Sequence, residues 1–372
     1  MVIEKSDYMK KKGLSLPLLI TVILLVTFGL IMIYSASSIW AEYKFHDSFH
    51  YVKQQALFTV IGFIIMYIVS KIDYNIYFKK ANIILGICFL LLILVLIPGI
   101  GSIRNGSRSW FGIGPFGVQP SEFIKLALII FTSKYLVNSN KFLKSYKKGV
   151  IPILGIACLA FGLIMLQPDL GTGLVLMVTI IAMLFIAGVN MKFFYILGVI
   201  GIIGVIILIA IAPYRMDRIT SFIDPWSDPL GTGFQIIQSL YAIGPGGLLG
   251  TGFLNSRQKH FYLPEPQTDF IFSIICEEFG VVGAIFIALL FFLLLYFGVK
   301  IALKSNDLFA KYLAFGLIFQ MIFQALMNLA VVIGLIPVTG VTLPFLSYGG
   351  SSLLISLLSI GILLNIAKKN NQ

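Results

Sequence analysis

Long apolar runs separated by short polar segments dominate the chain. A helix that crosses the hydrocarbon core of a bilayer needs about 20 apolar residues. Ten runs approach that length, near residues 14–35, 55–70, 81–99, 121–137, 150–166, 171–189, 192–212, 270–300, 309–335 and 345–367. The pattern therefore predicts an all-α polytopic membrane protein with ten transmembrane helices, in a single integral membrane domain over residues 1–372.

The segments between these runs predict the orientation. When the N-terminus is placed in the cytoplasm, most lysines fall into cytoplasmic segments, as the positive-inside rule requires. An even number of spans then returns the C-terminus to the same side. We expect residues 1–13 and 368–372 to be cytoplasmic tails, and residues 213–268 to form a large extracellular loop between helices 7 and 8.

Composition excludes several other classes of protein. The 372 residues are 59% hydrophobic and only 11% charged, whereas a soluble domain carries about 25% charged residues. Three cysteines, all inside apolar runs, exclude a disulfide-rich secreted scaffold. The net charge of +12 is explained by the cytoplasmic lysines, and no stretch is long enough for a soluble nucleic-acid module. We therefore expect no nucleic-acid partner.

The arginines are distributed differently from the lysines. All five lie in predicted outer loops, at Arg104, Arg108, Arg215, Arg218 and Arg257. The positive-inside rule alone would place them with the lysines. Because the planar guanidinium binds phosphate or carboxylate through two parallel hydrogen bonds, the distribution indicates an anionic ligand at the outer face.

An acidic residue stands at the head of the eighth run. Pro264 and Pro266 exclude a regular helix before about residue 266. Thr268 or Asp269 could therefore cap the helix that follows, through a side-chain oxygen. Alternatively, the Asp269 carboxylate could lie partly desolvated at the mouth of a membrane cavity and act as a general base. Spacing alone does not decide between these interpretations.

Ionisable residues inside the predicted spans are costly and need partners. Glu277 and Glu278 follow Asp269 on the same helix, and we expect them to be structural or to form the floor of a cavity. Lys125 follows Glu122 by three residues, so the two side chains can pair on one helix face. We interpret Lys125 as a functional residue.

Shorter outer loops carry further polar residues, each with a structural alternative. Trp110 could anchor the chain at the membrane interface or stack on a ligand. Asp169 could bind substrate or cap the sixth span. The small residues from Ser347 to Ser352 could form an anion site at the head of the last span, or only allow close helix packing.

Nucleotide-binding motifs are missing from the sequence. It contains no Walker motif, no Rossmann fingerprint in a suitable context and no zincin pair. The chain therefore does not supply energy from nucleotide hydrolysis, and a substrate would have to arrive already activated.

Taken together, the motifs resemble the SEDS family (shape, elongation, division and sporulation) of bacterial cell-wall proteins. The segments that carry the resemblance are 119–125 (QPSEFIK), 167–172 (QPDLGT), 224–225 (DP), 238–239 (QS), 264–272 (PEPQTDFIF), 277–280 (EEFG) and 347–352 (SYGGSS). Residues 258–264 (QKHFYLP) are more similar to the FtsW and SpoVE branch than to RodA.

The resemblance implies a ten-span fold and peptidoglycan glycosyltransferase activity at the outer face of a bacterial cytoplasmic membrane. The substrate would be lipid II, a disaccharide–pentapeptide on undecaprenyl diphosphate. The partners would be a class B penicillin-binding protein and other membrane proteins of the divisome or elongasome. Asp269 matches the family's essential acidic residue, which favours catalysis over capping. A divalent cation, Mg²⁺ or Mn²⁺, is a further expectation from the family, although the sequence shows no assembled ligand set.

On this hypothesis Asp269 deprotonates the 4-hydroxyl of the acceptor sugar, which attacks the anomeric carbon of the donor and expels its diphosphate with inversion. The substrate-binding residues would be Arg104, Arg108, Trp110, Gln119, Ser121, Glu122, Lys125, Gln167, Asp169, Arg215, His260, Glu265, Thr268, Ser347, Gly349, Gly350 and Ser351. One alternative is a lipid II flippase, in which Glu277 and Glu278 would continue a polar path inward. The other is a non-catalytic scaffold that activates the transpeptidase and does not need Asp269.

Overall fold

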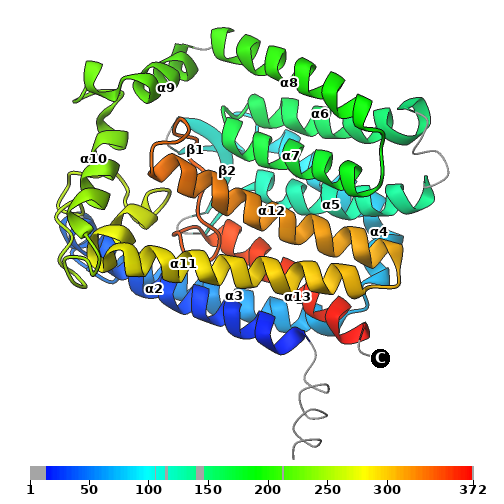
Figure 1. The fold of residues 1–372 in the computed structure, drawn as a ribbon, viewed down its shortest axis with the longest axis horizontal. Helices are drawn as coiled ribbons and strands as arrows, with labels where there is room; N and C mark the ends of the chain where they lie inside the picture. The colour runs from blue at the N-terminus through cyan, green and yellow to red at the C-terminus, as the bar shows by residue number, and fades with distance from the viewer. Residues whose placement is uncertain (1–13, 105, 114–115, 140–145, 212, 371–372) are drawn as a thin grey trace, which may run out of the picture.

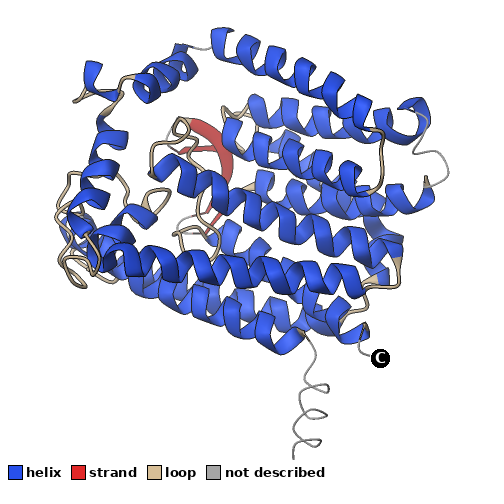
Figure 2. Cartoon of the chain, viewed as in Figure 1, coloured by secondary structure: helices blue, strands red, loops and turns tan. Residues whose placement is uncertain are grey.

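The computed structural model describes residues 14–104, 106–113, 116–139, 146–211 and 213–370. Long helices that run roughly side by side account for most of these residues, and the strands gather at one place (Figures 1 and 2). The long helices are α2 (Ser15–Phe45), α3 (His50–Lys71), α4 (Asn75–Leu94), α5 (Pro120–Asn138), α6 (Ile151–Met165), α7 (Leu170–Ile186), α8 (Met191–Ile211), α11 (Ile271–Lys304), α12 (Leu308–Val332) and α13 (Gly350–Lys369).

Seven stretches among the described residues are long and apolar enough to cross a membrane. They are α2, α3, α4, residues Lys148–Met165, α11, α12 and α13. Many large apolar side chains on their outer faces are exposed, including Ile64 on α3, Ile83 on α4 and Phe292 on α11. Such surfaces are stable in lipid and not in water, so the chain is a multi-pass membrane protein.

The two ends of the bundle differ, and we name them by their residues. The loop end carries residues 46–49, 95–104, 106–113, 116–119, 166–169, 213–270 and 333–349. The tail end carries residues 72–74, 187–190, 305–307 and the end of α13 (Figure 1). At the loop end, residues 213–268 contain α9 (Pro213–Ile223) and α10 (Phe234–Ile243) with the short helices η3 (Pro225–Ser227) and η4 (Gly244–Gly246).

A small antiparallel sheet makes the prediction of an all-α protein incomplete. Strands β1 (Ser102–Arg104), β2 (Ser107–Ile113) and β3 (Phe116–Val118) pair in the order β1-β2-β3. Gly106 lies in the turn between the first two strands with φ 78°, a conformation that glycine adopts without strain. The glycine-rich outer loop thus satisfies its backbone through a sheet.

Several helices have other bounds than the predicted spans and tails. The first predicted span ended at residue 35, but α2 continues to Phe45, because a helix can leave the membrane without ending. The last predicted span began at residue 345, but α13 begins at Gly350. Lys368 and Lys369, assigned to the C-terminal tail, belong to the last turn of α13. The predicted N-terminal tail, residues 1–13, lies outside the described residues.

Helix packing depends on small residues where helices meet closely. α13 lies against α3, and α11 lies against α12 and α2. A Cβ atom at Gly361 of α13 would lie 2.7 Å from the Met66 carbonyl oxygen of α3, and one at Gly298 of α11 would lie 2.4 Å from Ile318 of α12. Because lipid gives little hydrophobic force between helices, such close approach is what makes these contacts stable.

Candidate active site

Asp269 lies at the loop end, immediately before α11, and its side chain is half-buried. α11 begins at Ile271 with Phe270 as its N-cap, and no side chain in the described residues accepts a capping hydrogen bond there. The suggestion that Thr268 or Asp269 caps this helix was therefore wrong. The Asp269 carboxylate is left available for other contacts.

The backbone around Asp269 is fixed from two neighbouring segments. Asn328 of α12 donates from Nδ2 to the Asp269 carbonyl oxygen at 2.7 Å. The hydroxyl of Ser347 donates to the Thr268 carbonyl oxygen at 2.5 Å, and the Tyr348 amide donates to the Gln267 carbonyl oxygen at 2.8 Å. The main chain of Asp269 is therefore held in place by other residues, and its own carboxylate takes no part in these hydrogen bonds.

Burial and three neighbouring side chains affect the pKa of the Asp269 carboxylate. Burial raises its pKa above the usual range for aspartate, and the nearby Glu265 carboxylate raises it further. The Thr268 hydroxyl, 2.8 Å from Oδ1, and the Arg218 guanidinium act in the opposite direction. A carboxylate with a raised pKa is a stronger base, which is the property expected of a group that removes a proton from a hydroxyl.

A second polar group surrounds Lys125 on α5. Its ammonium donates to Oε1 of Glu122 at 2.8 Å, so the ion pair expected from the three-residue spacing is present, and it also donates to Oε1 of Gln324 at 2.9 Å. Both charged side chains are almost fully buried. Ionised groups are stable there only because they are paired and hydrogen-bonded.

Asp169 adjoins this group and has a structural role. It is the N-cap of α7, because its Oδ1 accepts from the Thr172 amide at 3.0 Å. Its Oδ2 accepts from Nε2 of Gln119 at 3.3 Å. Gln167 is fully buried, and its side-chain oxygen and nitrogen have no partner among the described residues. The Ser121 hydroxyl on α5 is likewise buried without a described partner.

Hydrogen bonds through the segment before α13 connect the two groups. Asn328, which holds Asp269, also donates to the Val341 carbonyl oxygen at 2.7 Å. Gln324, which accepts from Lys125, donates to the Thr342 carbonyl oxygen at 3.0 Å. Both amides lie on α12 about one turn apart. Asp269 and Lys125 thus belong to one continuous polar region at the loop end.

The last predicted loop contributes to this region in two ways. The Ser351 hydroxyl accepts from the Gln119 amide at 3.1 Å and donates to the Gly117 carbonyl oxygen at 3.1 Å. The Gly349 amide donates to Gln55 at 3.2 Å. A Cβ atom at Gly350 would lie 2.7 Å from the Phe58 ring, so at that position the close-packing alternative is correct.

Other predicted site residues also lie at the loop end. Arg108 and Trp110 are half-buried on β2, and His260 is exposed. Arg104 lies on β1 and Arg215 on α9, but their side chains are outside the described part of the chain.

Three residues near the site were missed in the sequence. Asn328 and Gln324 are amides inside an otherwise apolar span, and polar residues in a membrane helix are a recognisable signal. Arg218 was counted among the outer arginines but was not chosen as a site residue. It donates from Nη1 to the Val338 carbonyl oxygen at 2.9 Å and lies close enough to affect the Asp269 pKa.

The acidic residues do not form an obvious cation site. Among the described residues no group of three or more His, Cys, Asp or Glu side chains could hold a metal ion. Near Asp269 the other carboxylate is Glu265, and hard divalent cations prefer several oxygen ligands. The described residues near Asp269 therefore do not fit a cation held by the protein alone.

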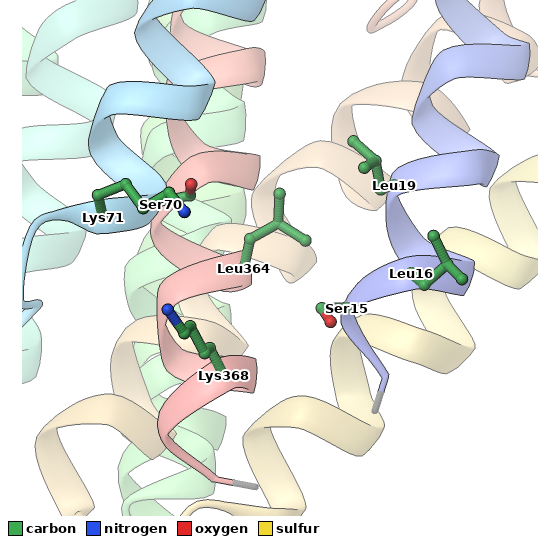
Figure 3. Close-up of a pocket in the computed structure, with 7 residues that line it drawn as sticks. All are labelled: Ser15, Leu16, Leu19, Ser70, Lys71, Leu364 and Lys368. Atoms are coloured by element: carbon green, nitrogen blue, oxygen red, sulfur yellow. The ribbon is translucent and has the colours of Figure 1, made fainter. Parts of the chain in front are cut away.

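Two cavities lie away from this polar region. One of about 230 Å³ opens at the tail end between α2, α3 and α13, and its lining is Ser15, Leu16, Leu19, Ser70, Lys71, Leu364 and Lys368 (Figure 3). The other, about 450 Å³, lies between α7 and α8 and is lined by apolar residues and glycine. Neither lining includes a predicted site residue, so the candidate site is defined by its hydrogen bonds and charges.

Several known proteins are similar to this chain along nearly its whole length. The model of the cell cycle proteins FtsW, RodA and SpoVE matches residues 16–372. The chain belongs to this family. It is 54% identical over 359 residues to stage V sporulation protein E of Bacillus subtilis (strain 168), covering 96% of this chain and 98% of that protein. It is 42% identical over 358 residues to the probable peptidoglycan glycosyltransferase FtsW of Geobacter sp. (strain M18), covering 96% and 98%.

Solved structures of the FtsW/RodA/SpoVE family have the same fold. A chain from a peptidoglycan synthase complex that coordinates polymerization and crosslinking superposes with a TM-score of 0.77 at 30% identity, covering 95% of this chain and 98% of that one. The rod shape determining protein RodA of Thermus thermophilus gives a TM-score of 0.67 at 27% identity, covering 95% and 97%. The predicted membership of the family is confirmed, and the relatives agree with the predicted similarity to the FtsW and SpoVE branch.

Proposed function

We propose that this protein is a peptidoglycan glycosyltransferase that polymerises lipid II into β-1,4 glycan strands, with Asp269 as the general base. The observation that carries the proposal is the state of the Asp269 carboxylate. It is half-buried with a raised pKa, its main chain is fixed by Asn328 and Ser347, and it does not cap α11. The relatives named as peptidoglycan glycosyltransferases support the same chemistry.

The chemistry requires one proton transfer and one displacement. Asp269 accepts the proton of the acceptor's 4-hydroxyl as the oxygen attacks the donor's anomeric carbon. The bond to the diphosphate breaks, and attack from the opposite side converts the α-linkage to β. The departing diphosphate needs positive charge, because it leaves without an acid to protonate it. Two cationic side chains could supply this charge. Arg218 lies close enough to Asp269 to lower its pKa, and Lys125 lies in the same polar region.

The orientation and the partner are part of the proposal. We infer that ten helices, α2 to α8 and α11 to α13, cross the bacterial cytoplasmic membrane, with the loop end outside and the tail end in the cytoplasm. Lipid II then meets Asp269 at the outer face. A class B penicillin-binding protein is the proposed partner, supported by the similarity to a complex that coordinates polymerization and crosslinking. Other divisome or elongasome proteins are further proposed partners.

Polymerisation of purified lipid II tests the catalytic assignment. The wild type, Asp269→Ala and Asp269→Asn are each combined with the transpeptidase partner, and glycan strands are resolved by length. We expect strands from the wild type and none from either variant, while folding and partner binding persist. Asp217→Asn is the matched control, because Asp217 is an exposed aspartate on α9 at the same end of the bundle. Normal polymer from Asp269→Ala would remove Asp269 from the mechanism.

The flippase alternative has lost its main support. It needed Glu277 and Glu278 as part of a polar path towards the cytoplasm. Both carboxylates instead accept hydrogen bonds from residues 256–259 at the loop end. Movement of labelled lipid II across vesicles, measured with Asp269→Asn, separates the activities, because a flippase would not need the base. A scaffold would make no strands from purified lipid II even as the wild type.

A further inference from the structure

α11 is interrupted by a break in which the long loop is inserted. Gly280 has φ 60° and ψ −153°, which is far from helical. The loop fills the break with its own backbone, because Thr251 and Gly252 donate to the carbonyl oxygens of Glu277 and Glu278 at 2.9 and 3.0 Å. On the other side, the amides of Val281 and Val282 donate to the loop. The freed helix groups are thereby satisfied inside a membrane protein, where leaving them unpaired would be costly.

Five buried side chains gather at the same break, and we call them the Lys259 cluster: Ser35, Ser256, Lys259, Glu277 and Glu278. The Lys259 ammonium lies 3.2 Å from Oε1 of Glu278 and donates to the Leu254 carbonyl oxygen at 2.6 Å. Ser35 of α2 donates to the same Glu278 oxygen at 2.5 Å. The Ser256 hydroxyl donates to Glu277 at 2.5 Å. The cluster therefore joins α2, the loop and α11.

The charges in this cluster are deeply buried. Lys259 is 4% exposed, Glu277 2% and Glu278 1%. A buried ion pair is stable only in a geometry that satisfies both partners, so it specifies one arrangement more than it adds stability. The contacts around Glu278 are of this kind, because its Oε1 accepts from Ser35, the Ser256 amide and Lys259.

This arrangement closes a segment of chain that contains Asp269. At one end, the Arg257 amide donates to Oε1 of Glu277 at 2.7 Å. From there the chain runs through residues 258–268 to Asp269, and the first turns of α11 return to Glu277. Glu265, which acts on the Asp269 carboxylate, lies in the same segment. A change at the Lys259 cluster would therefore displace Asp269 and Glu265 and alter the distance between them.

We propose that Lys259 and Glu278, together with Glu277, are positioning residues that set the place of the Asp269 carboxylate by holding the loop in the break of α11. This inference rests on the proposed function, in which Asp269 is the base. None of the three residues touches the substrate in this proposal. A displacement of about 1 Å at a reacting group can reduce turnover about 100-fold, so the effect is measurable even where the protein folds.

Kinetics of Lys259→Met, Glu278→Gln and the double variant test the proposal, with kcat expressed per folded molecule in complex with the transpeptidase. Lys259→Met leaves the Glu278 carboxylate without its cation, and we expect kcat to fall about 100-fold while KM for lipid II changes less than about threefold. The double variant removes both charges, and we expect it to recover at least tenfold, because a neutral pair is tolerated where a lone charge is not.

A pH profile separates positioning from a loss of stability. Burial and Glu265 raise the Asp269 pKa, while Thr268 and Arg218 lower it. A loosened loop would move Glu265 away and admit water, so the acidic limb of the Lys259→Met profile should shift to lower pH. Leu136→Ala is the control for stability, because Leu136 is fully buried at the tail end of α5. Leu136→Ala should lower the melting temperature. It should change neither the position of the acidic limb of the pH–rate profile nor kcat per folded molecule.

Three outcomes would overturn the inference. They are an acidic limb of the pH–rate profile that does not shift in Lys259→Met, an unchanged kcat in Lys259→Met, and a double variant whose kcat is no higher than that of Lys259→Met. Should Lys259→Met fail to fold, Ser256→Ala replaces it, because it removes a single hydroxyl, which donates to Glu277 and accepts from the Lys259 backbone amide. A tenfold loss of kcat with a normal KM is then expected, and wild-type kcat would contradict the proposal. Failure of the proposed function is recognised separately, because the wild type itself would then make no glycan.

Discussion

Replacing Gly280 by alanine should break the contact between the long loop and α11. The backbone at this position, φ 60° and ψ −153°, is one that residues with a Cβ atom rarely adopt. A Cβ atom would also lie 2.6 Å from both the Gly250 nitrogen and the Leu248 carbonyl oxygen and 2.7 Å from the Gly247 carbonyl oxygen. These are backbone atoms, so no flexible side chain can move aside, and the loop must leave the break.

The expected loss follows from strain and from the hydrogen bonds in the break. Forcing a side chain into this backbone region costs about 1–3 kcal/mol. Displacing the loop removes two to four backbone hydrogen bonds, each contributing roughly 1 kcal/mol net. Gly280→Ala should therefore lower the free energy of unfolding by roughly 3–7 kcal/mol. The loss of glycan synthesis should be larger than the loss of folded protein, because the Lys259 cluster lies beside the break.

Gly86→Ala is the matched control for Gly280→Ala. Gly86 lies within α4, and nothing is within 4 Å of a Cβ atom there. Alanine in a helix interior is favoured over glycine by about 0.5–1 kcal/mol, so this variant should be neutral or slightly more stable. Unfolding of both variants is measured by SDS titration in mixed micelles. Their glycan synthesis is measured with lipid II as the substrate. Equal unfolding free energies for the two variants would refute the account of the break.

Two further predictions concern charged groups at the site. Glycan synthesis should fall as the pH drops through the raised pKa of Asp269, because the base acts in its ionised form. In pH–rate profiles, Glu265→Gln should shift the acidic limb to lower pH, and Arg218→Gln should shift it to higher pH. An acidic limb that moves in neither variant would contradict this prediction. Lys125→Met should lower the unfolding free energy by about 3–5 kcal/mol, because it leaves the buried Glu122 carboxylate unpaired. The double variant with Glu122→Gln should recover most of that loss in the same SDS titration, and no recovery would show that the pair is not the source.

Much of the fold could be predicted because lipid imposes a simple pattern on sequence. The run near residues 121–137 became α5 (Pro120–Asn138), and the run near 192–212 became α8 (Met191–Ile211). Hydropathy did not predict the end of α2, since hydropathy reports where the membrane ends and not where backbone hydrogen bonding ends. The strands β1, β2 and β3 were not predicted, because strand pairing depends on contacts across a turn.

The candidate site was less predictable, because its residues meet only through long-range contacts. The spacing of Glu122 and Lys125 was sufficient to predict their ion pair, since both lie on one helix. Lys259 was predicted only as part of the extracellular loop of residues 213–268. Its pairing with Glu278 could not be predicted, because the two residues are 19 positions apart along the chain. Asn328 lies 59 residues from Asp269 along the chain, so only the fold shows that it holds the Asp269 main chain.

Asp169 and Asp269 differ by one residue in their place relative to the N-cap of the helix that follows, and this difference changes what each carboxylate can do. Asp169 and Asp269 both follow a proline-containing turn and precede an apolar helix. Asp169 is itself the N-cap of α7, and the Thr172 amide occupies its carboxylate. Asp269 lies one residue before the N-cap of α11, so the same side chain does not reach the helix amides. Because Asn328 holds the Asp269 main chain instead, its carboxylate is both fixed and available, which is the combination a general base requires.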